Sequence, residues 1–243
     1  MLKVELHTHT ADDPLDRIPY TTTQLIDRAA ALGYDALAVT LHDHQLDVAP
    51  LASYAADRGL VLIPGIERTI DGRHVLLLNF ARGADRVHSF ADLAALKATD
   101  PAGLVVAPHP FFPGSYCLRG LMDVHADLFD AVEWSGMFTS TLNFNDRGER
   151  WAREHRKPMV GNGDVHRLVQ LGPTCSLVDA EPNAAAICAA VKAGAVRVQT
   201  QPLSWLTAGS VFASLMLADA AGASPWLSAL RPREAALQRA ATL

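Results

Sequence analysis

Two histidines near the start of the chain, His7 and His9, are the first residues whose spacing indicates chemistry. They follow residues 4–6, a short run of alternating apolar and polar side chains that predicts a strand. Because residues two apart on a strand point to the same face, both imidazoles project to one side. Paired imidazoles form half of many transition-metal sites. Carboxylates that could complete such a site follow at Asp12, Asp13 and Asp16.

The same pattern, a short apolar strand followed by a His, Asp or Glu, recurs along the chain. Such strands precede the following residues: His42, Glu67, His109, Asp164 and His166. A single histidine is most often a surface or hydrogen-bonded residue, so the inference depends on their joint placement. The carboxyl ends of strands in an α/β sheet gather at one edge, where ligands bind. We therefore expect these side chains to meet in one metal site.

His74 is placed differently, because it begins a strand instead of ending one. Asp71-Gly72 is typical of a tight turn between two strands, here residues 60–66 and 75–80. A hairpin at this turn would bring His74 back beside Glu67.

Strands and helices alternate about seven times, which predicts an α/β fold with a parallel sheet and right-handed crossovers. Helix boundaries are indicated by residues such as Thr21, which opens a capping box with Gln24, and Gly33, which ends the same helix. The alanine- and leucine-rich tail after Leu203 is predicted to be helical and to pack on the barrel. The predicted strands are residues 4–6, 36–40, 60–66, 75–80, 104–107, 131–134, 158–160 and 196–200, and the predicted helices are residues 25–32, 50–58, 90–98, 142–155 and 183–192.

The composition bounds the class of protein. The 243 residues are 49% hydrophobic with a formal net charge of −5, which suits one globular domain of barrel size or two small ones. The sequence has no basic run, which argues against a long nucleic acid as partner. Three irregularly spaced cysteines and the lack of a signal peptide favour a reducing, cytoplasmic location. Polar residues within 198–218 argue against a membrane span there.

Six separated segments resemble the polymerase and histidinol phosphatase (PHP) family, in the family's order: ELHTHTADDP, ALAVTLHDH, IPGIE, GRHVLLL, VVAPHPF and VGNGDVH. The resemblance covers about residues 5–166, with weaker likeness to residue 200. It implies a distorted seven-stranded β/α barrel with up to three metal ions at its mouth. We expect this barrel to occupy residues 1–202 and a C-terminal helical extension to occupy residues 203–243.

The resemblance also implies a set of metal ligands. The register of this loop is shifted from the family pattern, so Asp12, Asp13 and Asp16 all compete for the position after the second histidine, and Asp13 is chosen. Leu41 replaces the first aspartate of the family's Thr-Asp-His-Asp turn. The implied ligands are His7, His9, Asp13, His42, Glu67, His74, His109, Asp164 and His166.

Two further residues are expected to contact the substrate. Arg119 lies in the loop from Pro110 to Gly120, which we expect to gate a shallow pocket, and a guanidinium suits phosphate oxygens. Glu133 ends the strand at residues 131–134 and resembles a pocket glutamate of the family.

The expected function is hydrolysis of a small phosphorylated molecule by hydroxide generated at two or three divalent ions, for which Zn, Mn and Fe all suit the ligand types. One alternative is an amidohydrolase-type barrel, but neither Lys97 nor Lys157 ends a strand where a bridging lysine would be needed. The other alternative is a catalytically silent PHP module. Nearly all of the implied ligands are present, which favours the enzyme.

Overall fold

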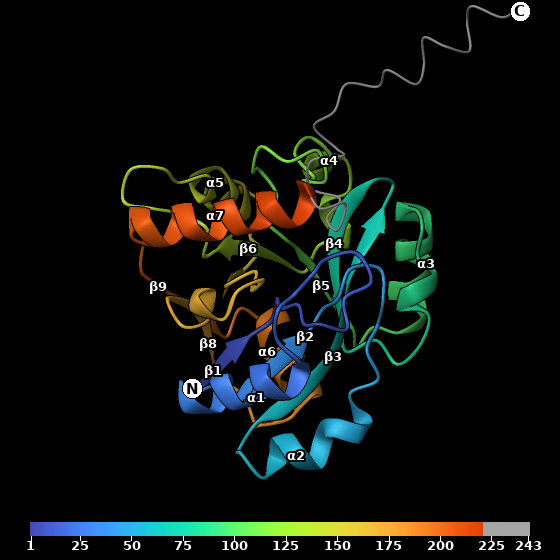
Figure 1. The fold of residues 1–243 in the computed structure, drawn as a ribbon. Helices are drawn as coiled ribbons and strands as arrows, with labels where there is room; N and C mark the ends of the chain where they lie inside the picture. The colour runs from blue at the N-terminus through green and yellow to red at the C-terminus, as the bar shows by residue number, and fades with distance from the viewer. Residues whose placement is uncertain (221–243) are drawn as a thin grey trace, which may run out of the picture.

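The computed structural model describes residues 1–220, and the nine strands found in that part of the chain form one sheet. Their order in the sheet is β7-β6-β5-β4-β3-β2-β1-β8-β9. The strands are β1 (Leu2–Glu5), β2 (Ala36–Val39), β3 (Val61–Ile70), β4 (Arg73–Leu78), β5 (Leu104–Ala107), β6 (Ala131–Ser135), β7 (Met159–Asn162), β8 (Thr174–Val178) and β9 (Val196–Thr200). Because β7 comes back against β8 and β9, the sheet is a nearly closed barrel (Figure 1). The mixed α/β barrel class is confirmed, with nine strands where seven were expected.

The sheet is mixed, not purely parallel. Two parallel groups, β1-β2-β3 and β5-β6-β7, are joined through β4, which is antiparallel to both of its neighbours. The turn predicted at Asp71 and Gly72 creates this reversal, and its residues have φ values of 47° and 74°. β8 and β9 extend the sheet beyond β1 in antiparallel pairs. β8 was not predicted, because Thr174 and Ser176 are polar although both are buried.

Side chains join β7 to β8 at the seam of the barrel. The hydroxyl of Ser176 accepts from Gly161 N at 3.0 Å and donates to Gly161 O at 3.1 Å. A Cβ on Gly161 would lie 2.7 Å from the Cys175 carbonyl oxygen, so this approach requires glycine. Beyond the seam, Val165 bonds the backbone of His7 and His9 at 3.1 Å each. The first histidine pair is thereby held beside residues 164–166.

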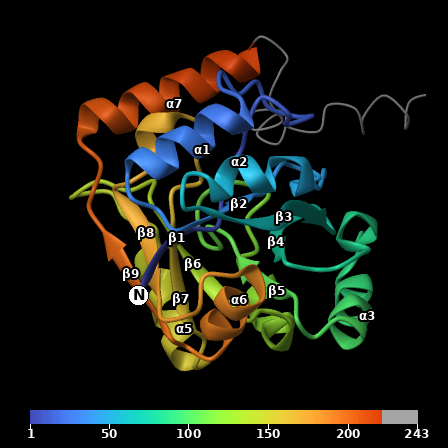
Figure 2. The same cartoon turned by 90° about the horizontal axis from the view of Figure 1, so that it is seen from below.

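Helices surround the sheet, and in the view of Figure 2 α1 and α7 lie on one side and α5 lies on the opposite side. The α-helices of the described residues are α1 (Thr22–Ala31), α2 (Ala52–Ala56), α3 (Phe90–Thr99), α4 (Leu121–Val124), α5 (Asn145–Glu154), α6 (Ala184–Lys192) and α7 (Trp205–Ala220). The expected capping box at Thr21 is present, with Gln24 as its partner. The helix expected at residues 50–58 is shorter, since a 3-10 turn at Ala49–Leu51 precedes α2.

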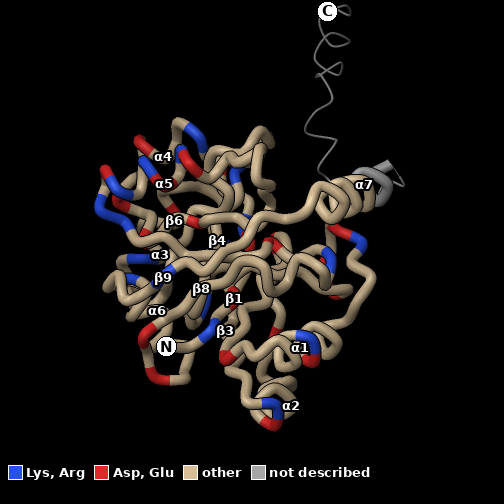
Figure 3. Tube along the Cα trace, turned by 90° about the vertical axis from the view of Figure 1, so that its left-hand side faces the viewer, with Lys and Arg blue, Asp and Glu red and all other residues tan. Residues whose placement is uncertain are grey.

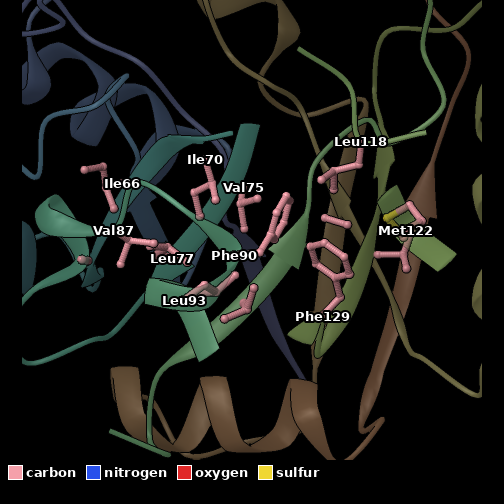
Figure 4. Packing of buried hydrophobic residues seen from close by; sticks show 14 of the residues in the cluster. Ile66, Ile70, Val75, Leu77, Val87, Phe90, Leu93, Leu118, Met122 and Phe129 are labelled. Atoms are coloured by element: carbon pink, nitrogen blue, oxygen red, sulfur yellow. The ribbon is translucent and has the colours of Figure 1, made fainter. Parts of the chain in front are cut away.

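Three buried apolar clusters support the barrel. The first lies between α3 and the strands β3, β4 and β5, and Figure 4 shows Phe90 and Phe129 within it. The second packs α6 on the sheet, and the third packs α1 and α2 against β2. Phe129 has no exposed surface, and its ring meets that of Phe90 at 6.5 Å between centroids. These clusters pack against the strands that carry the candidate ligands.

The start of the C-terminal tail is helical, as α7 shows, and it packs on the barrel. Leu203 N donates to the carbonyl of Phe138 at 2.9 Å, and Val211 is buried. Residues 221–243 lie outside the described part, as does most of the extension expected at residues 203–243. Among the described helices, none has the length and hydropathy needed to cross a bilayer.

Replacing Phe129 by alanine should destabilise the fold by about 3–5 kcal/mol, because it empties a fully buried ring site. Val124→Ala is the matched control, since Val124 is 69% exposed, and should change stability by less than about 0.5 kcal/mol. Urea denaturation followed by circular dichroism measures both values. Equal midpoints for the two variants would contradict this role of Phe129.

Candidate metal centre

The side chains expected to bind metal converge at one end of the barrel. Most of them follow the end of a strand, whereas Glu67 lies within β3 and His74 lies near the start of β4, and each is buried. The residues that meet there are His7, His9, His42, Glu67, His74, His109, Asp164 and His166. The convergence expected from the strand pattern is therefore seen in the structure.

Glu67, on β3, lies at the middle of this cluster. Oxygen Oε2 faces three imidazoles, at 3.2 Å from His7 Nε2, 3.3 Å from His9 Nε2 and 3.1 Å from His42 Nε2. Oxygen Oε1 lies 2.8 Å from His74 Nδ1 and 3.3 Å from His109 Nε2. His74 reaches this position through the β3–β4 hairpin, as expected. Both oxygens of this carboxylate therefore face candidate ligand nitrogens.

Asp164 is the second carboxylate inside the cluster. Its Oδ1 lies 3.4 Å from His7 Nε2, 3.6 Å from His9 Nε2 and 3.3 Å from His166 Nδ1. The residue has a φ of 48°, a left-handed conformation that turns its side chain inward. Gln170 Nε2 holds this turn by donating to the carbonyl of Asp164 at 2.8 Å.

Carboxylates outside the cluster fix the orientation of three histidines. The Nδ1 of His7 donates to Glu133 at 2.9 Å, while those of His9 and His42 donate to Asp13 at 2.9 and 3.0 Å. An ionised carboxylate only accepts hydrogen bonds, so the proton lies on Nδ1 in each case. This tautomer turns Nε2 toward the centre, the arrangement that metal-binding histidines adopt.

The surroundings of the inward-facing Nε2 atoms indicate whether these residues could bind a metal. In the described residues, Nε2 of His7, His9 and His42 is buried without a hydrogen-bond partner. Each faces an oxygen of Glu67, so lone pairs would oppose one another unless a proton or a cation lay between them. Imidazole and carboxylate donors together suit a divalent transition metal. The residues present therefore fit such an ion.

The candidate ligand atoms also gather in groups that share members. Within each group, the three ligand atoms lie within 4.8 Å of one another. The groups found among the described residues are His7 with His9 and Asp164, His42 with Glu67 and His74, His9 with His42 and His166, and His7 with His109 and Glu133. Shared members place the groups next to each other, as a centre with more than one ion requires.

The charges of the cluster are strongly coupled. Burial alone would lower the pKa of His7, but the carboxylates of Asp164 and Glu67 outweigh it and hold this pKa well above its ordinary value. The pKa of His42 is raised in the same way, against burial, by Glu67 and Asp13. Burial would raise the pKa of Glu67, yet His74 and His7 hold it well below its ordinary value. Protons on His7 and His42 would therefore offset the charge of these carboxylates when no metal is bound.

The three aspartates of the first loop have different surroundings. Asp13 uses both oxygens, since Oδ2 accepts from His9 and His42 and Oδ1 accepts from two backbone amides. Asp16 is buried, and its Oδ2 lies 3.0 Å from Nε2 of the candidate ligand His166. Asp12 accepts from Thr22 at 2.8 Å. This geometry favours Asp16 over Asp13 as the ligand.

The two residues expected to contact substrate differ in their surroundings. Arg119 is exposed, and its guanidinium donates to the backbone carbonyls of Phe112 and Pro113. Glu133 is buried and accepts from His7, from Asn162 at 2.9 Å and from the backbone of His109 at 2.7 Å. These placements favour positioning roles over substrate contact.

Sequence reasoning did not identify several supporting residues. Glu5 is buried and accepts from the backbone amides of His7 and Gly163, and burial raises its pKa to about 8. Asn162 ties Glu133 to the backbone of Leu6. The only signal for Glu5 was a charged residue inside a short strand that precedes two histidines.

A cavity of about 510 Å³ opens beside the cluster and reaches His109, Asp164 and His166. The loop from Pro110 to Gly120 forms one wall, as expected. Residues 135–144 and α7 add further walls, so the pocket is deeper than the sequence indicated. A larger hollow of about 1430 Å³, between residues 43–49 and 81–86, contains none of the clustered ligands.

Known sequences that resemble the chain match parts of it. The profile of the PHP-associated family matches residues 143–196. A 3′,5′-nucleoside bisphosphate phosphatase of Chromobacterium violaceum is 39% identical over 79 residues, which are 31% of this chain and 26% of that enzyme. The chain thus aligns with about a quarter of this relative.

Solved structures match most of the chain. A Bacteroides vulgatus two-domain protein, named as containing a predicted PHP-like metal-dependent phosphoesterase, has a TM-score of 0.58 at 16% identity, over 82% of this chain and 65% of that one. PsfC of Pseudomonas syringae has a TM-score of 0.57 at 16% identity, over 90% of this chain and 98% of that one. The lesion-specific endonuclease EndoQ of Pyrococcus furiosus has a TM-score of 0.56 at 15% identity, over 87% of this chain and 66% of that one. At these identities the likeness shows the fold, and with the profile match it confirms the resemblance to the PHP family.

Metal affinity should fall as the pH falls, because the raised pKa values of His7 and His42 mean that a metal must displace protons. Lowering the pH from about 8 to about 6 should weaken Mn²⁺ binding by more than about tenfold. Competition with a fluorescent chelator measures this affinity. His125→Ala, a change at a residue stacked on Phe90 away from the cluster, is the control and should keep the same pH response. An affinity independent of pH would contradict proton displacement.

Proposed function

We propose, from the resemblance to the PHP family and the geometry of the cluster, that the chain is a metal-dependent phosphoesterase acting on a small phosphorylated molecule. The observation that carries the proposal is the set of inward-facing Nε2 atoms around Glu67, each oriented from outside by a carboxylate. In the reaction, one water is consumed, the bond from phosphorus to the alcohol oxygen breaks, and the alcohol leaves with a proton.

Divalent ions bound by this cluster would stabilise negative charge on phosphoryl oxygens and make a water molecule more acidic. The ligands that we assign are His7, His9, Asp16, His42, Glu67, His74, His109, Asp164 and His166. They would hold two or three ions, for which Zn, Mn and Fe are all suitable.

The chain's own residues have separable tasks in this proposal. Glu67 and Asp164 set the spacing of the ligands, since their oxygens lie between imidazoles from different strands. Glu133 and Asp13 keep the histidine tautomers fixed. None of the described cavity-lining residues is Lys or Arg, so we assign no arginine to the phosphate. The ions themselves would then supply the positive charge that the phosphoryl group needs.

A small substrate is favoured over a long nucleic acid. On the face shown in Figure 3, blue Lys and Arg segments are interspersed with red Asp and Glu segments. A phosphate backbone binds best to a continuous basic stripe. The EndoQ similarity makes oligonucleotide cleavage the appropriate competing assay, and faster turnover of DNA or RNA than of small phosphate esters would overturn this part of the proposal.

Glu67→Gln should lower phosphoesterase activity by about 100-fold or more, because the neutral amide no longer bridges cations between β3 and its neighbours. Phosphate release from a panel of phosphate mono- and diesters, with Mn²⁺-reconstituted protein, measures the effect. The control Glu149→Gln changes an exposed residue of α5 and should retain full activity. Wild-type turnover of amides but not phosphate esters would instead indicate an amidohydrolase.

Asp16→Asn and Asp13→Asn should differ in metal content. If Asp16 is a ligand, its variant should lose about one ion of the two or three bound by the wild type. Asp13→Asn should keep the number of ions but bind them about 10- to 100-fold more weakly, since His9 and His42 lose their common acceptor. Elemental analysis gives the stoichiometry and chelator titration the affinity. Loss of an ion from the Asp13 variant alone would reverse the assignment, and less than about one ion in reconstituted wild type would remove the proposed centre.

A further inference from the structure

The cavity beside the cluster has a wall that the metal centre does not explain. One face of α7 supplies Trp205 and Phe212, which lie seven residues apart, with Gly209 between them, and all three line the cavity. Positions spaced by three or four residues share a helix face. Trp205 is 59% exposed and Phe212 is 60% exposed. Two large aromatic side chains thus present open surface next to the site.

Aromatic side chains also line the opposite walls. Phe112 and Phe144 meet with ring centroids 5.3 Å apart, and Tyr116 stacks on the ligand His74 at 4.8 Å. The cavity is therefore flanked by rings from three separate segments, and it continues to His109, Asp164 and His166. Whatever fills it would lie next to the metal ligands.

The charge of these walls restricts the occupant. Among the described lining residues, the ionisable ones are members of the metal cluster and Tyr116, and none is Lys or Arg. A second phosphate placed here would be desolvated without a cationic partner, which is costly. A flat uncharged group would instead stack on the rings and cover the exposed faces of Trp205 and Phe212.

We propose that this cavity binds an uncharged aromatic group on the alcohol side of the phosphate ester, so that the preferred substrate is an aromatic monoester with a single phosphate. The inference rests on the proposed phosphoesterase function and names its substrate class. A volume of about 510 Å³ is within the range of small-molecule pockets and has room for a two-ring group. Because the cavity is continuous with the metal cluster, we assign the substrate, and not a second protein, as its occupant.

The test compares 2-phenylethyl phosphate with ethyl phosphate, because their alcohols differ in the ring but are similar as leaving groups. With Mn²⁺-reconstituted full-length chain, kcat/KM should be at least about tenfold higher for the aromatic ester. Trp205→Ala and Phe212→Ala should each reduce this ratio by at least about threefold, mainly through KM. Leu206→Ala is the matched control, since Leu206 is 88% exposed on α7 and does not line the cavity.

A variant that fills the cavity gives an independent test. A Cβ built on Gly209 meets no atom within 4 Å, so Gly209→Leu should be accommodated in α7. Its added side chain would occupy space beside Trp205 and Phe212. It should therefore lower the ratio of kcat/KM for 2-phenylethyl phosphate to kcat/KM for ethyl phosphate. An equal kcat/KM for the two esters, or a ratio unchanged in all three cavity variants, would overturn the inference.

Two further measurements separate the inference from the proposed function. If no ester is hydrolysed, the proposed function fails. Calorimetry can still show whether the cavity binds an aromatic group, by comparing the affinities for 2-phenylethylphosphonate and ethylphosphonate. Tighter binding of the aromatic phosphonate, lost in Phe212→Ala, would support the aromatic site, whereas equal binding would overturn it. Faster hydrolysis of adenosine 3′,5′-bisphosphate than of adenosine 3′-monophosphate would overturn the preference for a single phosphate.

Discussion

The structure depends on one buried carboxylate, that of Glu67, which is placed among imidazoles from the segments after β1, β2 and β5 and from β4. A charged group with 1% exposure is costly unless opposite charge surrounds it. Protonated histidines can provide that charge, and so can divalent cations. The raised pKa of His7 and the lowered pKa of Glu67 are two results of this requirement. The barrel is therefore built around a position that needs a cation.

The requirement also accounts for a set of side-chain contacts between β6, β7 and the segment after β1. His7 must face Glu67 while its other nitrogen bonds Glu133, which lies on β6. Glu133 is held in turn by Asn162 at the end of β7, and Asn162 accepts from the backbone of Leu6. This chain of contacts connects β6 and β7 to the segment after β1 at the level of the ligands and orients the first ligand histidine.

The sequence was sufficient to identify ligands whose position follows from a regular element. His42 and His109 follow short apolar strands, and Glu67 follows the apolar run predicted at residues 60–66, although β3 continues to Ile70 in the structure. It was insufficient where an irregular segment decides the direction of a side chain. The loop that contains Asp13 and Asp16 has no period, so only the hydrogen bonds of Asp13 distinguish the two. Arg119 has a φ of 48°, which nothing in its neighbourhood of the sequence indicated.

The position of α7 over the cavity was also beyond sequence reasoning, because residues 205–218 are apolar or neutral on every side and indicate no single buried face. In the structure, Val211 is buried while Leu206 and Phe212 are exposed. An apolar helix with exposed aromatic residues is costly in water unless its open face serves binding. The site thus has two halves with opposite needs. Divalent cations would neutralise the charged half and bind the phosphate of the proposed substrate, while its uncharged ring would stack in the aromatic half.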